Sequence, residues 1–306
     1  MQYELTIIGG GPAGVSAGVY AARKKIKTLF ITESFDNQSI VSPDIHNWIG
    51  TVSISGADLA KSLEAHLKAY AGDDVTIKTG LRAKNISKQE DGTFNVETSD
   101  GTFNTKTVLI ATGSNRRKLD IKGADIFEHK GLTYCATCDG PLYAGADVAV
   151  IGGGNAAFET AAQLSAYCKS VTIVNRSEKY RADEVTVEKV LAKDNVKALA
   201  PVELLEVKGE KFVGTLAVKR GEETIELPVT GIFVEIGLLP NTDYAKDVVE
   251  RNPVGQVVVD PKTQMSKTAG IWAAGDCTDG LYHQNNIAAG DAVKALEDIY
   301  NFLHTR

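Results

Sequence analysis

The chain of 306 residues is long enough for one large domain or two ordinary ones, and its composition, 43% apolar and 24% charged, is that of a soluble globular protein. Its net charge of −6 argues against a nucleic-acid partner, and no apolar run approaches the roughly 18 residues of a membrane span. The start, "MQYELTIIGGG", lacks the basic and long apolar regions of a signal peptide, and four cysteines do not make a disulfide scaffold, so a reducing, cytoplasmic compartment is expected.

The first predicted element is a β-strand that runs into a glycine-rich turn. Residues 4–14 read "ELTIIGGGPAG", and a helical pattern and a second apolar run, "TLFIT" at 28–32, come next. Gly9, Gly11 and Gly14 fit a dinucleotide-binding turn: the first permits the tight turn, the second lets the backbone approach a pyrophosphate, and the third lets helix and strand pack closely. The free N–H groups at the start of the helix favour the same anion.

The same unit occurs a second time, 143 residues later (152 − 9). Residues 147–157 read "DVAVIGGGNAA", followed by a helical pattern that includes Cys168 and by the apolar run "VTIVN" at 171–175. Gly152, Gly154 and Ala157 form the G-x-G-x-x-A variant of the turn. Two such units in one chain predict an α/β protein with two Rossmann-like domains and two bound dinucleotides.

The two copies differ where a dinucleotide's ribose is recognised. The first copy has Glu33 after its second strand, and a carboxylate there accepts hydrogen bonds from ribose hydroxyls. Adding 143 gives Arg176, with Arg181 five residues on, and arginine accommodates a ribose 2′-phosphate. The first copy therefore suits FAD or NAD and the second favours NADP. The alternative is that Arg176 is a solvated loop charge.

The copies are not laid end to end. Apolar strands ending in glycine motifs, "TVLIATGSN" before the second copy and "GIWAAGDCTDG" near the C-terminus, indicate that the chain leaves its first domain, builds the second and returns, with a turn at Pro240-Asn241. The last stretch has the apolar spacing of a helix. We therefore predict a discontinuous domain, 1–115 and 244–306, with a second domain, 116–243, inserted in it; the resemblance described next implies that the first binds FAD and the second NAD(P).

The order of motifs, GGGPAG, ATG, CxxCDG, GGGNAA, GLLPNT and AAGD, resembles the low-molecular-weight thioredoxin reductases. It is also similar to the flavoprotein part of the alkyl hydroperoxide reductase component that feeds electrons to a peroxiredoxin. The similarity extends over essentially the whole chain. It implies FAD in the outer domain, a nicotinamide nucleotide in the inserted one, and a homodimer.

The resemblance also implies roles for individual residues. Gly9, Gly11 and Gly14 would hold the FAD pyrophosphate and Glu33 its ribose. The other implied FAD contacts are Gln38, Asn47, Thr112, Gly113, Gly275, Asp276 and Gln284. In the second domain, Gly152, Gly154 and Ala157 would hold the nicotinamide nucleotide.

Some positions depart from the pattern of the reductases. Their "RQA" is His283, Gln284 and Asn285 here, and their NADPH signature, HRR…R, is Asn175, Arg176, Ser177 and Arg181. Two of the three arginines remain, whereas the NADH-using peroxide-reductase relatives have an acid at the position of Asn175. The sequence therefore favours NADPH, with NADH as the alternative.

The pair Cys135–Cys138, in "TYCATCDGPLY", permits three interpretations. A zinc site needs about four ligands, and neither the lone Cys168 and Cys277 nor the scattered histidines supply a second pair, so no metal is expected. A structural disulfide would be unusual in a reducing compartment. A CxxC beside flavin and nicotinamide domains is best interpreted as a thiol–disulfide couple.

The resemblance assigns Cys138 to the flavin, Cys135 to the attack on a partner disulfide, and Asp139 to acid–base catalysis; the alternative for Asp139 is a helix N-cap. Cys168 and Cys277 are expected to be buried packing residues. The function implied is a thioredoxin-disulfide reductase acting on thioredoxin or a related small redox protein. Because the chain starts with the FAD strand, any thioredoxin-like domain is expected on a separate protein.

Three other functions stay open at this point. One is a disulfide reductase for another partner, such as a peroxiredoxin. Another takes electrons from ferredoxin instead of a nicotinamide, and a third is a dithiol oxidase that uses oxygen. A non-enzymatic binding module is the remotest, because it explains neither two nucleotide turns nor the dithiol.

Overall fold

The computed structural model describes residues 2–42 and 45–305. These residues form two compact units, the first made of residues up to Asn115 and from Leu239 onward, the second of Arg116–Leu238. The chain passes between the units twice, through the paired strands β7 (Ser114–Arg116) and β16 (Leu238–Pro240). The fold is α/β, as predicted.

The return to the first unit comes earlier than the 243/244 boundary expected from the sequence. Asn241 bonds back to the first unit through three contacts: its backbone N–H donates to Gly113 O, its side-chain Nδ2 donates to Thr112 O, and its carbonyl accepts from Thr112 Oγ1. These contacts place residues 239–243 with the first unit.

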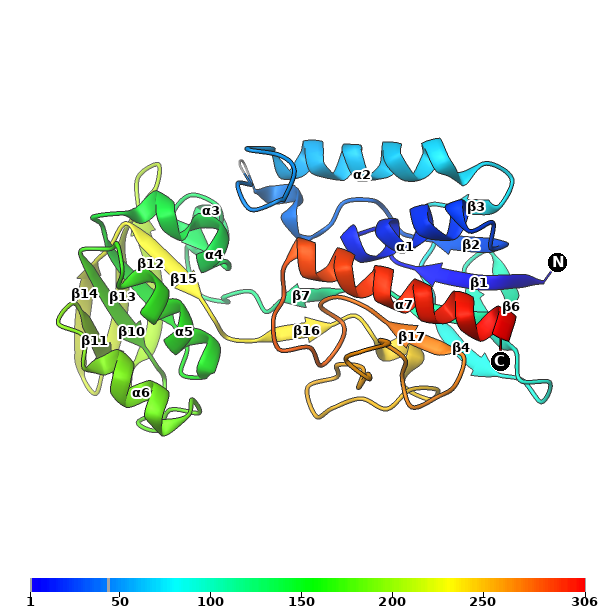
Figure 1. Ribbon diagram of the computed structural model, residues 1–306. Coiled ribbons are helices and arrows are strands. Elements are labelled where there is room, and N and C mark those ends of the chain that lie inside the picture. Colours follow the sequence, from blue (N-terminus) through cyan, green and yellow to red (C-terminus); the bar gives the residue numbers. More distant parts are fainter. Residues whose placement is uncertain (1, 43–44, 306) are drawn as a thin grey trace. The chain divides into compact units, whose positions relative to one another are not determined.

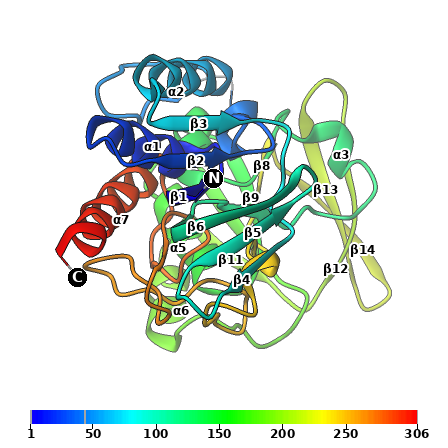
Figure 2. The same cartoon turned by 90° about the vertical axis from the view of Figure 1, so that its right-hand side faces the viewer.

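The first unit is built on a seven-stranded sheet in the order β3-β2-β1-β6-β5-β4, with β17 also paired to β6. Strands β1, β2, β3, β6 and β17 are parallel, whereas β5 and β4 are antiparallel; Figure 2 shows β6, β5 and β4 next to one another. The strands are β1 (Tyr3–Ile8), β2 (Thr28–Ile31), β3 (Val75–Lys78), β4 (Asn85–Lys88), β5 (Phe94–Thr98), β6 (Gly101–Ile110) and β17 (Ile271–Ala273).

Three helices lie on one face of this sheet, α1 (Pro12–Arg23), α2 (Gly56–Ala71) and α7 (Asn285–Thr305), and α1 packs against both others (Figure 1). Alternate residues of β1 point to opposite faces, so Leu5 and Ile7 join the core under the helices while Ile8 joins the core of the other face. Two short helices, η1 (Gln38–Val41) and η3 (Asp243–Ala245), complete the unit.

The second unit has a five-stranded parallel sheet in the order β11-β10-β9-β15-β8. One face carries α5 (Asn155–Leu164) and α6 (Glu184–Leu191), and the other packs on an antiparallel sheet of β12, β13 and β14. The strands are β8 (Leu132–Thr133), β9 (Asp147–Ile151), β10 (Ser170–Val174), β11 (Val196–Leu199), β12 (Glu203–Gly209), β13 (Val213–Arg220), β14 (Glu223–Pro228) and β15 (Gly231–Val234). The short helices are α3 (Ala124–Phe127), α4 (Ala136–Asp139) and η2 (Gly140–Tyr143).

Two predicted helices differ in how well the sequence defined them. The C-terminal one is confirmed as α7, with Ala288, Ala292, Leu296 and Ile299 buried. The helix after the second glycine turn ends at Leu164, so Cys168 lies beyond it, which corrects the prediction. The chain turns there because Gly145 N–H bonds Tyr167 O and Lys169 N–H bonds Ala146 O. None of the described helices is long and apolar enough to cross a bilayer.

Replacing Phe158 tests the core between α5 and the parallel sheet. Phe158 is fully buried, so Phe158→Ala should lower the free energy of unfolding by about 3–5 kcal/mol through lost contacts and a cavity. Phe212→Ala removes a ring that is 66% exposed and should change it by less than about 0.5 kcal/mol. Urea unfolding followed by circular dichroism measures both, and equal effects would contradict the packing described.

Candidate functional site

The first glycine turn joins β1 to α1, and three glycines shape it for different reasons. Gly9 has φ 124°, and a Cβ there would overlap the carbonyl oxygen of Ala111 at the end of the neighbouring β6. A Cβ on Gly14 would overlap the carbonyl of Gly9, so helix and strand pack closer than any side chain allows. Gly11 is different, because its Cβ would meet only Asn37 Cβ at 3.7 Å. The side of the turn that faces outward from the Gly11 Cα is therefore not filled by other protein atoms.

The surroundings of Gly11 suit an anionic group. Gly11 is the N-cap of α1 without a side-chain cap, and the first turn of α1 has no acidic residue. Asn37 Nδ2, a buried donor beside Gly11, has no partner in the described part of the chain, while Asn37 Oδ1 accepts from Ser39 N–H at 2.9 Å. A phosphate or hydroxyl oxygen at this place would satisfy both the helix N–H groups and Asn37. The residues therefore fit the pyrophosphate part of a dinucleotide.

Several predicted contacts gather around Asp276, which follows Gly275 at the end of β17. Asp276 accepts from Gln38 Nε2 at 3.2 Å, and Gln38 also reaches Ser114 Oγ at 3.4 Å. Gly275 has φ 77° and faces Ala288 of α7. His283 Nδ1, where the reductases have arginine, is buried without a hydrogen bond among the described residues and lies 3.5 Å from Asp276 Oδ1.

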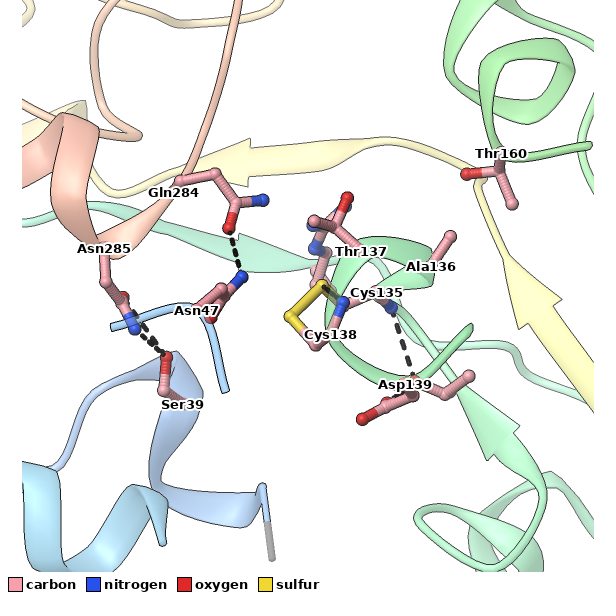
Figure 3. Close-up of a disulfide and its surroundings, with 12 residues drawn as sticks. Ser39, Asn47, Cys135, Ala136, Thr137, Cys138, Asp139, Thr160, Gln284 and Asn285 are labelled. Atoms are coloured by element: carbon pink, nitrogen blue, oxygen red, sulfur yellow. Dashed lines mark hydrogen bonds between the residues drawn. A yellow bond between two sulfur atoms is a disulfide. The ribbon is translucent and has the colours of Figure 1, made fainter. Parts of the chain in front are cut away.

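Three consecutive amide side chains at or just before the start of α7 bond Ser39 and Asn47. Gln284 Oε1 accepts from Asn47 Nδ2 at 3.1 Å and Asn285 Nδ2 donates to Ser39 Oγ at 2.9 Å (Figure 3). Asn286 Nδ2 donates to Asn47 O at 2.6 Å. Asn285, a departure from the reductase pattern, thus has a structural partner. Gln284 and Asn47 are brought together, as the resemblance implied.

The other predicted contacts of the first unit are held by the protein itself. The Thr112 hydroxyl donates to Asn241 O at 2.6 Å, and Gly113 has φ 62° with open space beside it. Glu33, just beyond β2, is exposed and is held by Arg82, whose Nε lies 3.1 Å from Glu33 Oε2. No sequence motif marks Arg82, so the prediction from sequence missed it.

The second glycine turn joins β9 to α5 with the same geometry. Gly152 has φ 149°, and a Cβ there would overlap the carbonyl oxygen of Glu235 at the end of the neighbouring β15. Gly154 is the N-cap of α5, without a side-chain cap, and a Cβ there would meet nothing within 4 Å. Ala157 is fully buried against Gly152. This turn also fits a pyrophosphate.

The loop after β10 presents two arginines and is braced by Asn175. Arg176 and Arg181 are exposed, and within the described residues neither is in an ion pair. Asn175 is buried, and its Nδ2 donates to Ser177 O at 2.6 Å and Lys179 O at 3.3 Å. Thr32 has the equivalent position in the first copy (175 − 143) and likewise donates to Ser34 O, at 2.5 Å. The Asn175 side chain therefore stabilises the conformation of this loop. An ionised acid at this position could not donate these hydrogen bonds.

Glu235, which was not selected from the sequence, is a largely buried carboxylate at the end of β15. Its Oε1 accepts from Thr160 Oγ1 at 3.0 Å, and its Oε2 lies 3.6 Å from Arg116 Nη1. Burial raises the pKa of Glu235 above its usual value, against the lowering effects of Arg116 and Thr160.

Cys135 and Cys138 form a disulfide with a Cα–Cα distance of 5.3 Å (Figure 3). Cys135 is the N-cap of α4, and its Sγ accepts from Cys138 N–H at 3.2 Å; this contact stabilises negative charge on that sulfur when the bond is open. Gln163 on α5 accepts from Thr137 Oγ1 and donates to Ala136 O, both at 3.3 Å, and so fixes α4 to the helix that follows the second glycine turn.

Asp139 lies in the same turn as the disulfide. Its Oδ2 accepts a hydrogen bond from the Thr133 hydroxyl, and its backbone N–H donates to Cys135 O at 3.0 Å. The side chain does not cap η2, so the N-cap alternative is not what the structure has. Thr133 is a further partner, and no motif in the sequence would have selected it.

The remaining two cysteines are buried. Burial raises the pKa of Cys168 to about 11 and that of Cys277 to about 12, so both stay thiols at neutral pH. Cys277 Sγ donates to Ala274 O at 3.3 Å, and Cys168 Sγ to Tyr143 O at 3.3 Å. In the described residues, His, Cys, Asp and Glu form no group of three or more that could hold a metal ion.

A family model described as pyridine nucleotide-disulphide oxidoreductase matches residues 3–292. This description fits a chain that has two glycine turns of the dinucleotide-binding type and a disulfide. The chain belongs to this family. Membership implies FAD and a pyridine nucleotide as cofactors, and it confirms the predicted pair of dinucleotide-binding domains.

Individual members of the family are similar over the whole chain. An NADH dehydrogenase of Bacillus subtilis is 38% identical and an alkyl hydroperoxide reductase component of Escherichia coli is 37% identical, each over 98% of this chain. The chain spans 58% of the length of both relatives. The crystal structure of thioredoxin reductase from Streptococcus pyogenes is 30% identical with a TM-score of 0.90, covering 100% of this chain and 99% of that one.

Glu235→Gln tests the electrostatic cost of the buried carboxylate in this oxidoreductase. Because the pKa of Glu235 is raised on folding, the folded protein holds this proton more tightly than the unfolded chain, and the stability contribution falls as pH rises above the usual value of about 4.3. The free energy of unfolding of the variant, relative to the wild type, should therefore rise between about pH 4 and pH 7. Urea unfolding at several pH values measures this, and a variant that becomes progressively less stable would contradict it.

Proposed function

We propose that this oxidoreductase uses NADPH, in preference to NADH, to reduce the Cys135–Cys138 disulfide and then a disulfide on thioredoxin or a thioredoxin-like protein. The observation that carries the proposal is that disulfide, on a short helix fixed by Gln163 to the helix of the second nucleotide turn. We also expect FAD at the first turn, a homodimer and a cytoplasmic location.

The chain's residues divide between the two cofactors. Gly9, Gly11, Gly14 and Asn37 hold the FAD pyrophosphate, with Glu33 at its ribose. Gly152, Gly154 and Ala157 hold the pyrophosphate of the nicotinamide nucleotide, and the exposed Arg176 and Arg181 bind its 2′-phosphate. When bound, these cofactors would supply the two electrons that open the disulfide.

Opening Cys135–Cys138 consumes two electrons and two protons and yields two thiols. Asp139, held by Thr133, exchanges a proton with a thiol of the pair. The Cys135 thiolate, which receives the Cys138 N–H, attacks the partner's disulfide and forms a mixed disulfide, releasing one partner thiolate. Cys138 then attacks Cys135, which restores the disulfide and releases the partner as a dithiol.

A second candidate partner is a peroxiredoxin system. It is favoured by the 37% identity with the alkyl hydroperoxide reductase component of Escherichia coli over 98% of this chain. The same two thiols would reduce either partner, so the surface on which the partner protein docks would decide between thioredoxin and a peroxiredoxin system. Steady-state reduction of thioredoxin and of a peroxiredoxin, each with NADPH, compares the two directly.

Matched glycine variants separate the two nucleotide sites. A methyl group on Gly154 would meet nothing within 4 Å and one on Gly11 only Asn37 Cβ at 3.7 Å, so in the absence of cofactors Gly11→Ala and Gly154→Ala should both have the melting temperature of the wild type. Gly11→Ala should lose bound flavin because the methyl group occupies the pyrophosphate's approach, whereas Gly154→Ala should keep flavin and lose binding of NADP⁺. Flavin absorbance and calorimetric titration measure this. The opposite pattern would reverse the assignment of the two cofactors.

Cysteine variants test the order of the thiol steps. Cys138→Ser leaves Cys135 able to attack but removes the thiol that resolves the mixed disulfide, so a one-to-one covalent complex with oxidised thioredoxin should accumulate. Cys135→Ser should form no such complex, and Cys168→Ser should keep full turnover. Non-reducing electrophoresis detects the complex, and trapping by Cys135→Ser alone would reverse the two roles.

A further inference from the structure

The two copies of the nucleotide unit differ at one position beside the glycine turn. In both copies the strand next to the first strand ends in a residue whose carbonyl lies under the first glycine, Ala111 under Gly9 and Glu235 under Gly152. The residues after it correspond as well, since "ATG" at 111–113 matches "EIG" at 235–237, an offset of 124 (235 − 111). The first copy therefore has a methyl group where the second has a carboxylate.

The helix that packs beside this position differs in the same way. Thr160 of α5 corresponds to Ala17 of α1 (160 − 143), and Ala17 and Ala111 are both buried in one apolar core. In the second copy Thr160 Oγ1 instead donates to Glu235 Oε1 at 3.0 Å. The first copy shows that an alanine pair is compatible with this fold, whereas burying a carboxylate lowers the stability of the folded protein. Packing therefore does not account for the polar pair.

Topology places Glu235 at the ligand crevice. In the order β11-β10-β9-β15-β8, the chain from β9 runs outward through β10 and β11 in one direction, and β15 lies on the other side of β9. Ligands of such sheets bind beyond the carboxyl ends of the strands, where the order reverses. Arg176 follows β10 on the adenosine side. The other half of the dinucleotide must then extend over β15, where Glu235 stands.

We propose that Glu235 binds the nicotinamide riboside half of the pyridine nucleotide, accepting hydrogen bonds from its carboxamide N–H or ribose hydroxyl groups. This rests on the proposed function of the second unit as the nicotinamide nucleotide site. A carboxylate has about four acceptor positions. Glu235 accepts one bond from Thr160, Arg116 is more distant at 3.6 Å, and the charge of Glu159 is also nearby. Glu235 thus keeps acceptor capacity, and Thr160 and Arg116 orient it.

The test measures binding of two ligands that differ only in the nicotinamide riboside. Flavin-loaded wild type, Glu235→Ala and Glu235→Gln are titrated calorimetrically with NADP⁺ and with 2′-phospho-ADP, which lacks that half. The exposed Glu210→Gln, in the turn before β13, is the matched control. Glu235→Ala should weaken NADP⁺ binding about tenfold and leave the fragment unchanged, with Glu235→Gln in between because its amide oxygen still accepts.

The outcomes are distinguishable. Unchanged NADP⁺ binding by Glu235→Ala, or equal weakening of both ligands, overturns the inference, since a merely structural role affects both ligands alike. Wild type that binds neither ligand, nor NAD⁺ and ADP, overturns the proposed function on which the inference rests. Binding of the fragment by Glu235→Ala also shows that the second unit of the variant is folded.

Discussion

The close approach of a strand carbonyl to the first glycine of each turn is the constraint on which both units depend. The carbonyls of Ala111 and Glu235 occupy the space that a side chain on Gly9 or Gly152 would need. This approach brings the start of the following helix to the carboxyl ends of the parallel strands. There the helix N–H groups have no side-chain cap, and the open sides of Gly11 and Gly154 leave room for an anionic group. The disulfide segment is fixed to one of these helices by Gln163.

The parts of this protein that the sequence predicted are those with a local signal. Both glycine turns, the inserted second unit and the CxxC pair follow from short motifs and from the 143-residue repeat, because strand period, turn glycines and cysteine spacing are local properties. The return of the chain at Leu239 was placed a few residues late, since the contacts of Asn241 with Thr112 and Gly113 join segments far apart in sequence. The end of α5 at Leu164 depends likewise on backbone bonds to residues 145–146.

The residues that sequence reasoning missed act through such long-range contacts. Arg82 meets Glu33 across 49 positions, and Thr160 meets Glu235 across 75. Glu235 had one detectable signal, because aligning "ATG" with "EIG" exposes an acid where the first copy has alanine. Asn175 was not missed, since it was named from the sequence, but its local role was signalled only by its repeat partner Thr32, which donates to a carbonyl of the equivalent loop. A residue-by-residue comparison of the two copies, beyond their glycines, separates positions that make the same contact in both copies, such as Asn175 and Thr32, from positions where the copies differ, such as Glu235 and Ala111.

The central claim is that electrons pass from NADPH to the Cys135–Cys138 disulfide. The most direct test is an anaerobic titration of the flavin-loaded protein with NADPH and then NADH, following flavin absorbance and counting new thiols. We expect flavin bleaching by near-stoichiometric NADPH, a weaker response to NADH, two new thiols that are absent in Cys135→Ser, and loss of the NADPH preference in Arg176→Ala. Bleaching by neither nucleotide, while dithionite still reduces the flavin, would contradict the claim and favour a donor such as ferredoxin.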